Sequence, residues 1–258
     1  MLRGQLRCIR RGVKLLNSTR YFAVDSNETR KKIVVFGGSG YVGSNVVQAA
    51  LRSGHEVVSI NRNAPAFSDN PHLTYRAGDV LKADDWRDEL TGCDAVISCV
   101  GCFGSNEKML RINGDGNVNV ITEALLQGVP RVVYVSTVEN NLPDFLLRGY
   151  FEGKRRAEQA LLEAFPEPGT GVVLRPSFIY GHRKVALRNP LSPSSEAALD
   201  VPLNLLGRPL ELLLSNPLAD KLRNVLPGMQ APLAPPISVS DVAAAAVLVA
   251  EGAEQTRA

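Results

Sequence analysis

The chain has 258 residues, 45% of them hydrophobic and 21% charged, which provides enough apolar material for one large domain and excludes a disordered chain. Four Cys and three His in a chain of this length exclude a disulfide-built scaffold and argue against a His-rich metal centre. The longest apolar run, residues 242–250, is far shorter than the roughly 20 residues that a membrane-spanning helix needs, so no transmembrane segment is expected.

The N-terminal segment is basic and amphipathic. No acidic residue precedes Asp25, and apolar residues recur there at spacings of four and three, which place them on one face of a helix. This combination is typical of a mitochondrial or plastid transit peptide, and a basic surface helix or a nucleic-acid-binding arm is the alternative interpretation. The basic residues are Arg3, Arg7, Arg10, Arg11, Lys14 and Arg20, and the apolar ones are Leu2, Leu6, Ile9, Val13 and Leu16.

Cleavage near Ala23 changes the charge balance of the remainder. It leaves 23 Lys and Arg against 26 Asp and Glu, a net charge of −3, which argues against nucleic-acid binding. We therefore expect an imported organelle protein with a transit peptide and linker in residues 1–30, a main domain in 31–250 and a tail in 251–258. The Arg-rich helix favours the mitochondrion over the plastid.

From Lys31 onward, short apolar runs alternate with longer helical stretches, the pattern of an α/β protein. Continuous apolar strands joined by helices predict a parallel sheet covered on both faces. The expected strand order along the sheet is 3-2-1-4-5-6. The expected strands are residues 33–36, 56–60, 73–76, 95–99, 131–135 and 171–174, and the expected helices are residues 41–52, about 107–127, and 150–164.

The sequence changes in character after Pro176. Residues 185–236 hold nine prolines among many leucines, which predicts short helices and loops. We expect them to form a small Leu/Pro-rich cap over about 183–236 rather than a second full domain.

A glycine motif, Gly37-x-x-Gly40-x-x-Gly43, directly follows the first strand and opens the first helix. Such a turn needs glycine so that a pyrophosphate can approach the backbone and accept hydrogen bonds from the start of the helix. In its strand–turn–helix context the motif predicts a Rossmann-type dinucleotide site, and the alternative is a purely structural turn. The site residues expected here are Gly37, Gly38, Ser39, Gly40, Tyr41, Val42 and Gly43. A P-loop is not expected, because the motif lacks the lysine.

The ends of the following strands carry further candidate contacts. Asn61 and Arg62 end the second strand, where an acidic residue would favour NAD and an Arg accommodates the 2′-phosphate of NADP, so NADP(H) is favoured over NAD(H). The alternative for Arg62 is a solvated surface charge. Asp79 and Val80 follow the third strand near the expected adenine, and Val100 and Gly101 close the fourth strand where the dinucleotide would cross the sheet edge.

Tyr150 and Lys154 form a Y-x-x-x-K element at the head of a predicted helix, which places both side chains on one helical face. A nearby ammonium favours tyrosinate, so Tyr150 is a candidate general acid/base for a carbonyl–alcohol interconversion, and Lys154 would also reach the nicotinamide ribose. An aromatic anchor beside a surface lysine is the alternative. Cys99 and Cys102 have the spacing of a redox motif. They do not lie at a helix start, which would lower a thiol pKa, so a structural role is favoured over redox chemistry.

Several motifs together resemble an extended or atypical short-chain dehydrogenase/reductase. They are the glycine turn, residues 78–80, Asn113, the Tyr150/Lys154 pair, residues 174–181 and residues 236–243. Residues 98–106 and 149–155 further resemble the mitochondrial branch related to the nucleotide-binding accessory subunit of complex I and to the short-chain-dehydrogenase-like protein of ubiquinone biosynthesis. The resemblance implies a protein of the mitochondrial matrix, or the matrix face of the inner membrane, that works near quinone metabolism or the respiratory chain. It also implies dinucleotide contacts at Pro176, Ser177 and Phe178.

One position departs from the family pattern. Val138 stands where the family places its catalytic hydroxyl, so either Ser136 or Thr137 orients the substrate carbonyl after a shift in the loop, or this hydrogen-bond donor is missing. Two functions stay open: an NAD(P)(H)-dependent oxidoreductase on a carbonyl or quinone-related substrate, and a non-catalytic accessory or assembly subunit that holds a dinucleotide. The leucines between Leu203 and Leu226 would form a quinone pocket, lie on a membrane surface, or simply pack the cap.

Overall fold

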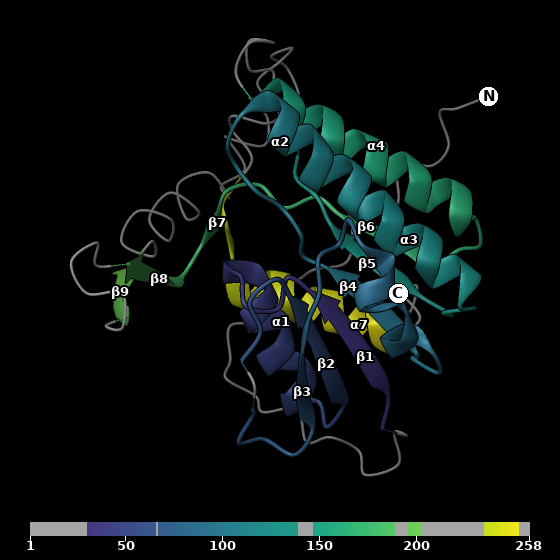
Figure 1. Ribbon diagram of the computed structural model, residues 1–258, viewed down its shortest axis with the longest axis horizontal. Helices are drawn as coiled ribbons and strands as arrows, with labels where there is room; N and C mark the ends of the chain where they lie inside the picture. The colour runs from purple at the N-terminus through teal and green to yellow at the C-terminus, as the bar shows by residue number, and fades with distance from the viewer. Residues whose placement is uncertain (1–29, 66, 139–146, 189–195, 203–234, 253–258) are drawn as a thin grey trace.

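The computed structural model describes residues 30–65, 67–138, 147–188, 196–202 and 235–252 (Figure 1). The expected transit peptide, the leucines of residues 203–226 and most of the expected tail lie outside the described residues. Within the described residues, no helix is long and apolar enough to cross a membrane.

Six parallel strands form the central sheet in the order β3-β2-β1-β4-β5-β6, which confirms the predicted fold and strand order (Figure 1). In the central register, Val34 of β1 pairs with Val58 of β2 on one side and with Val96 of β4 on the other. The strands are β1 (Lys32–Phe36), β2 (Glu56–Asn61), β3 (Leu73–Ala77), β4 (Ala95–Ser98), β5 (Val132–Val135) and β6 (Gly171–Leu174).

The sheet is buried on both faces because its central strands are mostly apolar on both sides. Along β1, Ile33 and Val35 face one core cluster, whereas Val34 and Phe36 face the other, and all four side chains are fully buried. Helices α1 (Tyr41–Arg52) and α7 (Val239–Glu251) cover the first face, and α3 (Gly116–Leu126) and α4 (Arg148–Ala164) cover the second (Figure 1).

The helix expected over residues 107–127 is interrupted. It consists of α2 (Asn106–Leu110), a π-helical turn η4 (Arg111–Asp115) and α3. The carbonyl of Asn113 accepts hydrogen bonds from the side-chain amide of Asn117 at 2.9 Å and from the Tyr134 hydroxyl at 3.4 Å. These side chains compete for a carbonyl of the regular helical ladder, which is a recognised cause of such interruptions.

The connection between β3 and β4 also contains elements that the sequence did not predict. Two 3-10 turns, η2 (Ala83–Asp85) and η3 (Arg87–Leu90), flank Trp86. The Trp86 ring is buried and meets the Phe36 ring edge-on at a centroid distance of 4.8 Å. Its indole N–H donates to the carbonyl of Asp79 at 2.8 Å, so this short connection closes one side of the core.

The start of the expected cap is a β-hairpin and not a set of short helices. Strands β8 (His182–Arg188) and β9 (Glu196–Pro202) pair antiparallel. The prolines that suggested broken structure flank these strands: Pro190 and Pro193 lie between them in sequence, and Pro202 ends β9, where proline is tolerated. The remainder of the expected cap, residues 203–234, lies outside the described residues.

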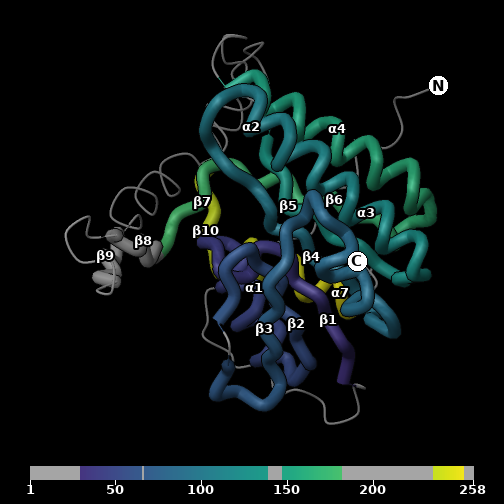
Figure 2. Tube along the Cα trace, viewed as in Figure 1, coloured from purple at the N-terminus to yellow at the C-terminus, as the bar shows by residue number. Residues whose placement is uncertain are grey.

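A short parallel pair marks where this segment leaves and rejoins the main domain. Strand β7 (Ile179–Tyr180) lies beside β10 (Ile237–Ser238), with Ile179 paired to Ile237 (Figure 2). The backbone N–H of Ile237 donates to the carbonyl of Phe178 at 2.9 Å. Helix α7 then starts at once, with the Ser238 hydroxyl accepting the N–H of Asp241 at 3.0 Å as an N-cap.

A buried histidine ties the end of α7 to the amino ends of the strands. His55 is 2% exposed; its Nδ1 accepts the backbone N–H of Lys31 at 3.4 Å, so its Nε2 donates to Glu251 at 2.9 Å. This hydrogen bond is the main reason why the pKa of Glu251 lies below its usual value. Glu251, the last residue of α7, is thereby held against the sheet.

Candidate functional site

The glycine turn links β1 to α1 with no space for a side chain at Gly38 or Gly43. Gly37 has a φ of +75°, a conformation that favours glycine. A Cβ on Gly43 would lie 2.1 Å from the carbonyl oxygen of Gly37, and a Cβ on Gly38 would lie 2.2 Å from the hydroxyl of Ser59. The first turn of α1 therefore packs directly on the turn that precedes it.

The same geometry suits an anionic group. Gly40 is the N-cap of α1; it makes no side-chain cap, and the first helical turn holds no acidic residue. Gly40 is exposed, and a Cβ there would meet only the carbonyl oxygen of Gly37, at 3.1 Å. The helix start thus presents backbone N–H groups and a positive dipole end to an open surface, which fits the pyrophosphate of a dinucleotide.

The buried Asn61 side chain, at the end of β2, holds the glycine turn by a hydrogen bond. Its side chain is 5% exposed, its Oδ1 accepts the backbone N–H of Ser39 at 2.7 Å, and its Nδ2 donates to the Ser59 hydroxyl at 2.9 Å. The sequence predicts Asn61 as a cofactor contact at the end of the second strand, and in the structure its amide fixes the glycine turn. Arg62, the next residue, is exposed at the end of β2.

The expected adenine-side residues have structural contacts of their own. The Asp79 carboxylate accepts the backbone N–H of Leu81 at 3.0 Å, which shapes the loop after β3. Val80 is buried, and its side chain lies against Gly116 at the start of α3, where a Cβ would approach it to 2.6 Å. Asp79 is half-buried and so borders the surface, whereas Val80 belongs to the core.

Lys154 lies at the centre of the carboxyl edge of the sheet. Its Nζ donates to the carbonyl of Val135, the last residue of β5, at 2.8 Å and to that of Val100, after β4, at 3.4 Å. The side chain is 5% exposed, and its ammonium lies 4.7 Å from the centre of the Tyr134 ring. Burial lowers the pKa of Lys154 to about 8, so the amine exchanges its proton near neutral pH.

Tyr150 lies one helical turn before Lys154, within an aromatic cluster. The Phe103 ring stacks on it at a centroid distance of 5.0 Å and an angle of 13°, and the Phe151 ring meets it edge-on at 5.3 Å. The Lys154 ammonium lies over the Tyr150 ring, 5.8 Å from its centre. Burial raises the pKa of Tyr150, so its phenol is protonated at neutral pH, and the tyrosinate that the sequence predicted beside the ammonium is not favoured.

Two glycines that sequence reasoning missed bring this pair to the sheet edge. A Cβ on Gly149 would lie 2.0 Å from the carbonyl oxygen of Asn106 in α2, and a Cβ on Gly153 would lie 2.9 Å from the backbone nitrogen of Gly114 in η4. Each glycine directly precedes one member of the Tyr150/Lys154 pair. The G-x-x-x-G spacing was the available signal, because it allows two helices to approach closely.

Ser136 has an unusual environment among the described residues. It directly follows β5, is 5% exposed, and donates its backbone N–H to Leu174 at 2.7 Å. Its hydroxyl is buried and has no hydrogen-bond partner among the described residues. Thr137 is half-buried, and the backbone N–H of Val138 donates to Pro176 at 3.0 Å. Of the two candidate hydroxyls, that of Ser136 is therefore the one that needs a partner.

The remaining predicted contacts lie on the segments after β6 and after β4. Pro176 is buried, and the Ser177 hydroxyl donates to the carbonyl of Pro235, which fastens this segment to the start of β10. Phe178 is 54% exposed. Val100 is buried beside Lys154, and Gly101 is exposed; a Cβ on Gly101 would lie 3.6 Å from the Lys154 ammonium.

The two cysteines near this edge are free thiols. Burial raises the pKa of Cys99 to about 12, which keeps it protonated and unreactive at neutral pH. The described residues hold no group of His, Cys, Asp or Glu suited to a metal ion.

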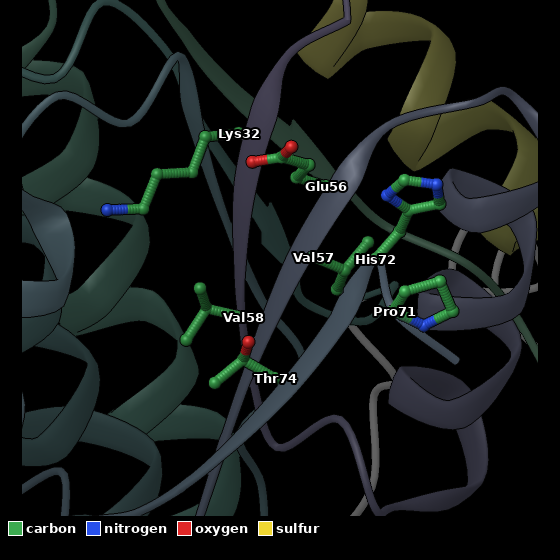
Figure 3. A pocket seen from close by; sticks show the side chains of 7 residues that line it. All are labelled: Lys32, Glu56, Val57, Val58, Pro71, His72 and Thr74. Atoms are coloured by element: carbon green, nitrogen blue, oxygen red, sulfur yellow. The ribbon is translucent and has the colours of Figure 1, made fainter. Parts of the chain in front are cut away.

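A cavity of about 220 Å³ lies at the opposite, amino end of β1–β3, away from the glycine turn (Figure 3). Its lining residues include Lys32, Glu56 and His72.

Comparison with known proteins identifies relatives for most of the chain. Residues 37–179 match the model of a family described as NAD(P)H-binding. An uncharacterized chloroplastic protein of Arabidopsis thaliana is 42% identical over 225 residues, which cover 84% of this chain and 70% of that protein. Cinnamoyl-CoA reductase 1 of Oryza sativa is 31% identical over 147 residues, which cover 50% of this chain and 43% of the reductase.

Solved structures support the same architecture. The enzyme WbmH of Bordetella bronchiseptica, solved in complex with NAD+, superposes with a TM-score of 0.56 over 87% of this chain and 73% of its own. The two sequences are 19% identical, so the likeness concerns the fold alone.

Proposed function

The chain belongs to the NAD(P)H-binding, short-chain dehydrogenase/reductase-like family, and from this membership we propose that it reduces a carbonyl group with NAD(P)H bound across the carboxyl ends of its strands. The observation that carries the proposal is the meeting of three groups at one sheet edge. They are the glycine turn without side chains, the buried Lys154 amine and the unpartnered Ser136 hydroxyl. The pyrophosphate would bind at Gly40 and the start of α1, and Lys154 would hold the ribose at the reactive end.

Three side chains near the expected nicotinamide would have separate roles in the reduction. The reduced nicotinamide supplies a hydride to the carbonyl carbon when it is bound. The Ser136 hydroxyl would donate a hydrogen bond to the carbonyl oxygen and so orient it. Tyr150 would then give its phenolic proton, which it still carries at neutral pH, to that oxygen. The Lys154 ammonium, close to the Tyr150 ring, stabilises the phenolate that remains.

The Tyr150→Phe variant tests the proposal. Loss of the phenolic proton is expected to lower kcat for carbonyl reduction by about 10²–10⁴-fold, with dinucleotide affinity unchanged. Tyr75→Phe, which removes a hydroxyl from β3, is the matched control and should retain full activity. Full turnover by the Tyr150 variant would contradict the assignment of the proton donor.

A second candidate function is that of a non-catalytic accessory subunit that holds a dinucleotide. The observation that favours it is the packing of Tyr150 between Phe103 and Phe151, which also suits a structural residue. Under this alternative the protein would act in ubiquinone biosynthesis or in a respiratory-chain assembly, as its family resemblance implies. Rescue of cells lacking the native protein by Tyr150→Phe, as fully as by wild type, would support it.

Cofactor preference depends on Arg62. An exposed guanidinium at the end of β2 suits the 2′-phosphate of NADP(H), so we expect calorimetric titration of the protein from Ala23 onward to show tighter binding of NADPH than of NADH. Arg62→Ala should weaken NADPH binding by about tenfold, the effect of one lost charge-assisted hydrogen bond, and leave NADH unchanged. An equal loss for both nucleotides would mean that Arg62 does not contact the 2′-phosphate.

The location of the protein is a further part of the proposal. The basic, acid-free start supports import into an organelle, and its Arg-rich, amphipathic sequence pattern favours the mitochondrion. The chloroplastic relative supports the plastid in its place. Fusion of residues 1–30 to a fluorescent protein distinguishes the two destinations, and a fusion that stays in the cytosol would contradict both.

A further inference from the structure

Phe103 is an exposed ring on an anchored loop. On one side, the Asn113 amide binds both backbone groups of Cys102, accepting its N–H at 2.9 Å and donating to its carbonyl at 3.1 Å. On the other side, the Ser105 hydroxyl accepts the N–H of Lys108 at 3.3 Å and caps α2. The short stretch between these anchors holds Phe103, so the backbone fixes where its ring stands.

Phe103 belongs to an aromatic cluster around Tyr150, and part of its own ring is not covered by that cluster. Phe103 stacks on Tyr150, and Phe151 closes the cluster edge-on. Phe103 nevertheless remains 66% exposed, and its loop neighbours Gly101 and Gly104 contribute no side chain to cover it. Phe103 is therefore held beside Tyr150 with much of its ring in water, where it is available to pack against a bound substrate.

We propose that Phe103 determines substrate specificity and that the substrate is a carbonyl compound with a flat aromatic ring, which packs against the exposed part of Phe103 and presents its carbonyl to Tyr150. This inference rests on the proposed reductase function, since it assigns the substrate class of the same site. Aromatic pairs gain stabilisation beyond the area they bury, so the cluster favours an aromatic ring over a saturated ring of similar size. Phe178, also half-exposed, lies on another segment assigned to this site.

Binding measurements with two probes test the inference without requiring turnover. Benzyl alcohol and cyclohexylmethanol are titrated by NMR into the full chain saturated with oxidised dinucleotide, and the ratio of their affinities is compared between variants. Wild type should bind benzyl alcohol about tenfold tighter, and Phe103→Leu should reduce this ratio to near one. Phe67→Leu, at a phenylalanine that is 77% exposed in the loop after β2, is the matched control and should keep the wild-type ratio.

The corresponding aldehydes then separate this inference from the proposed function. The kcat/KM ratio for benzaldehyde over cyclohexanecarbaldehyde should follow the same pattern across the variants. A ratio that Phe103→Leu leaves unchanged, or a wild type without preference, overturns the inference even if both aldehydes are reduced. Phe103-dependent binding without any turnover supports the aromatic subsite and contradicts the reductase proposal. Phe103→Tyr retains a ring and should keep the preference, which guards against a folding defect in the leucine variant.

Discussion

Replacement of Gly43 by Ala is expected to abolish dinucleotide binding and to destabilise the fold. The added Cβ would lie 2.1 Å from the carbonyl oxygen of Gly37, so the turn and the helix must move apart. Forced overpacking of this kind costs about 2 kcal/mol of unfolding free energy. The displaced helix start should weaken NADPH binding by more than about 100-fold. Thermal unfolding and calorimetric titration of the same sample measure both effects.

Gly40→Ala separates the two effects. Its Cβ would meet only one backbone oxygen, at 3.1 Å, so the fold should lose little stability, yet the methyl group would stand on the surface where the pyrophosphate is expected. Ser44→Ala, an exposed position in the same helical turn, is the control and should bind as wild type does. Tight NADPH binding by Gly40→Ala would place the pyrophosphate elsewhere.

The second large effect is expected for Lys154→Met. Removal of the buried amine should lower kcat/KM by about 10²–10⁴-fold, because the phenolate of Tyr150 and the ribose both lose their cation. In wild type, kcat/KM should fall above about pH 8, where the free enzyme loses the Lys154 proton. A wild-type profile that stays flat through pH 9 would contradict a role for the ammonium.

Stability should show the opposite dependence on pH. Between about pH 8 and the usual lysine pKa of 10.5, the unfolded chain binds a proton that the folded chain does not bind. The contribution of Lys154 to the free energy of unfolding therefore rises across this window, by up to about 3 kcal/mol. Denaturant titrations of wild type and Lys154→Met at several pH values measure how much of the pH dependence of the unfolding free energy comes from Lys154. Lys82→Met, at an exposed lysine, should leave the wild-type pH dependence unchanged.

The central sheet could be predicted because each of its signals is local. The apolar run of β1, the glycine turn and the stop at Gly54 determine the bounds of β1 and α1 almost to the residue. The π-helical turn could not be predicted, because it depends on Tyr134 from β5, which approaches Asn113 only in the folded sheet. The pairing of Ile179 with Ile237 depends likewise on contacts between distant segments.

The candidate site likewise has features that the sequence predicts and contacts that only the folded chain shows. The motifs identified the turn, Tyr150 and Lys154, because residue type and spacing are sufficient to recognise them. The role of Asn61 beneath the turn was missed, since a polar residue at a strand end gives no sign of which way its amide points. The stack of Phe103 on Tyr150 joins the loop after β4 to helix α4, which are far apart in sequence, and no local pattern predicts it.

The pairing of β7 with β10 has an evolutionary consequence. The chain leaves the main domain after Tyr180 and returns at Ile237, whose pairing partner is Ile179, so the two crossing points are neighbours in space. The entropic cost of closing a loop grows only slowly with its length. Residues 181–236 can therefore lengthen, shorten or be exchanged between lineages while the sheet and the glycine turn remain unchanged. Changes of length in this segment therefore need not disturb the part of the chain that is proposed to hold the dinucleotide.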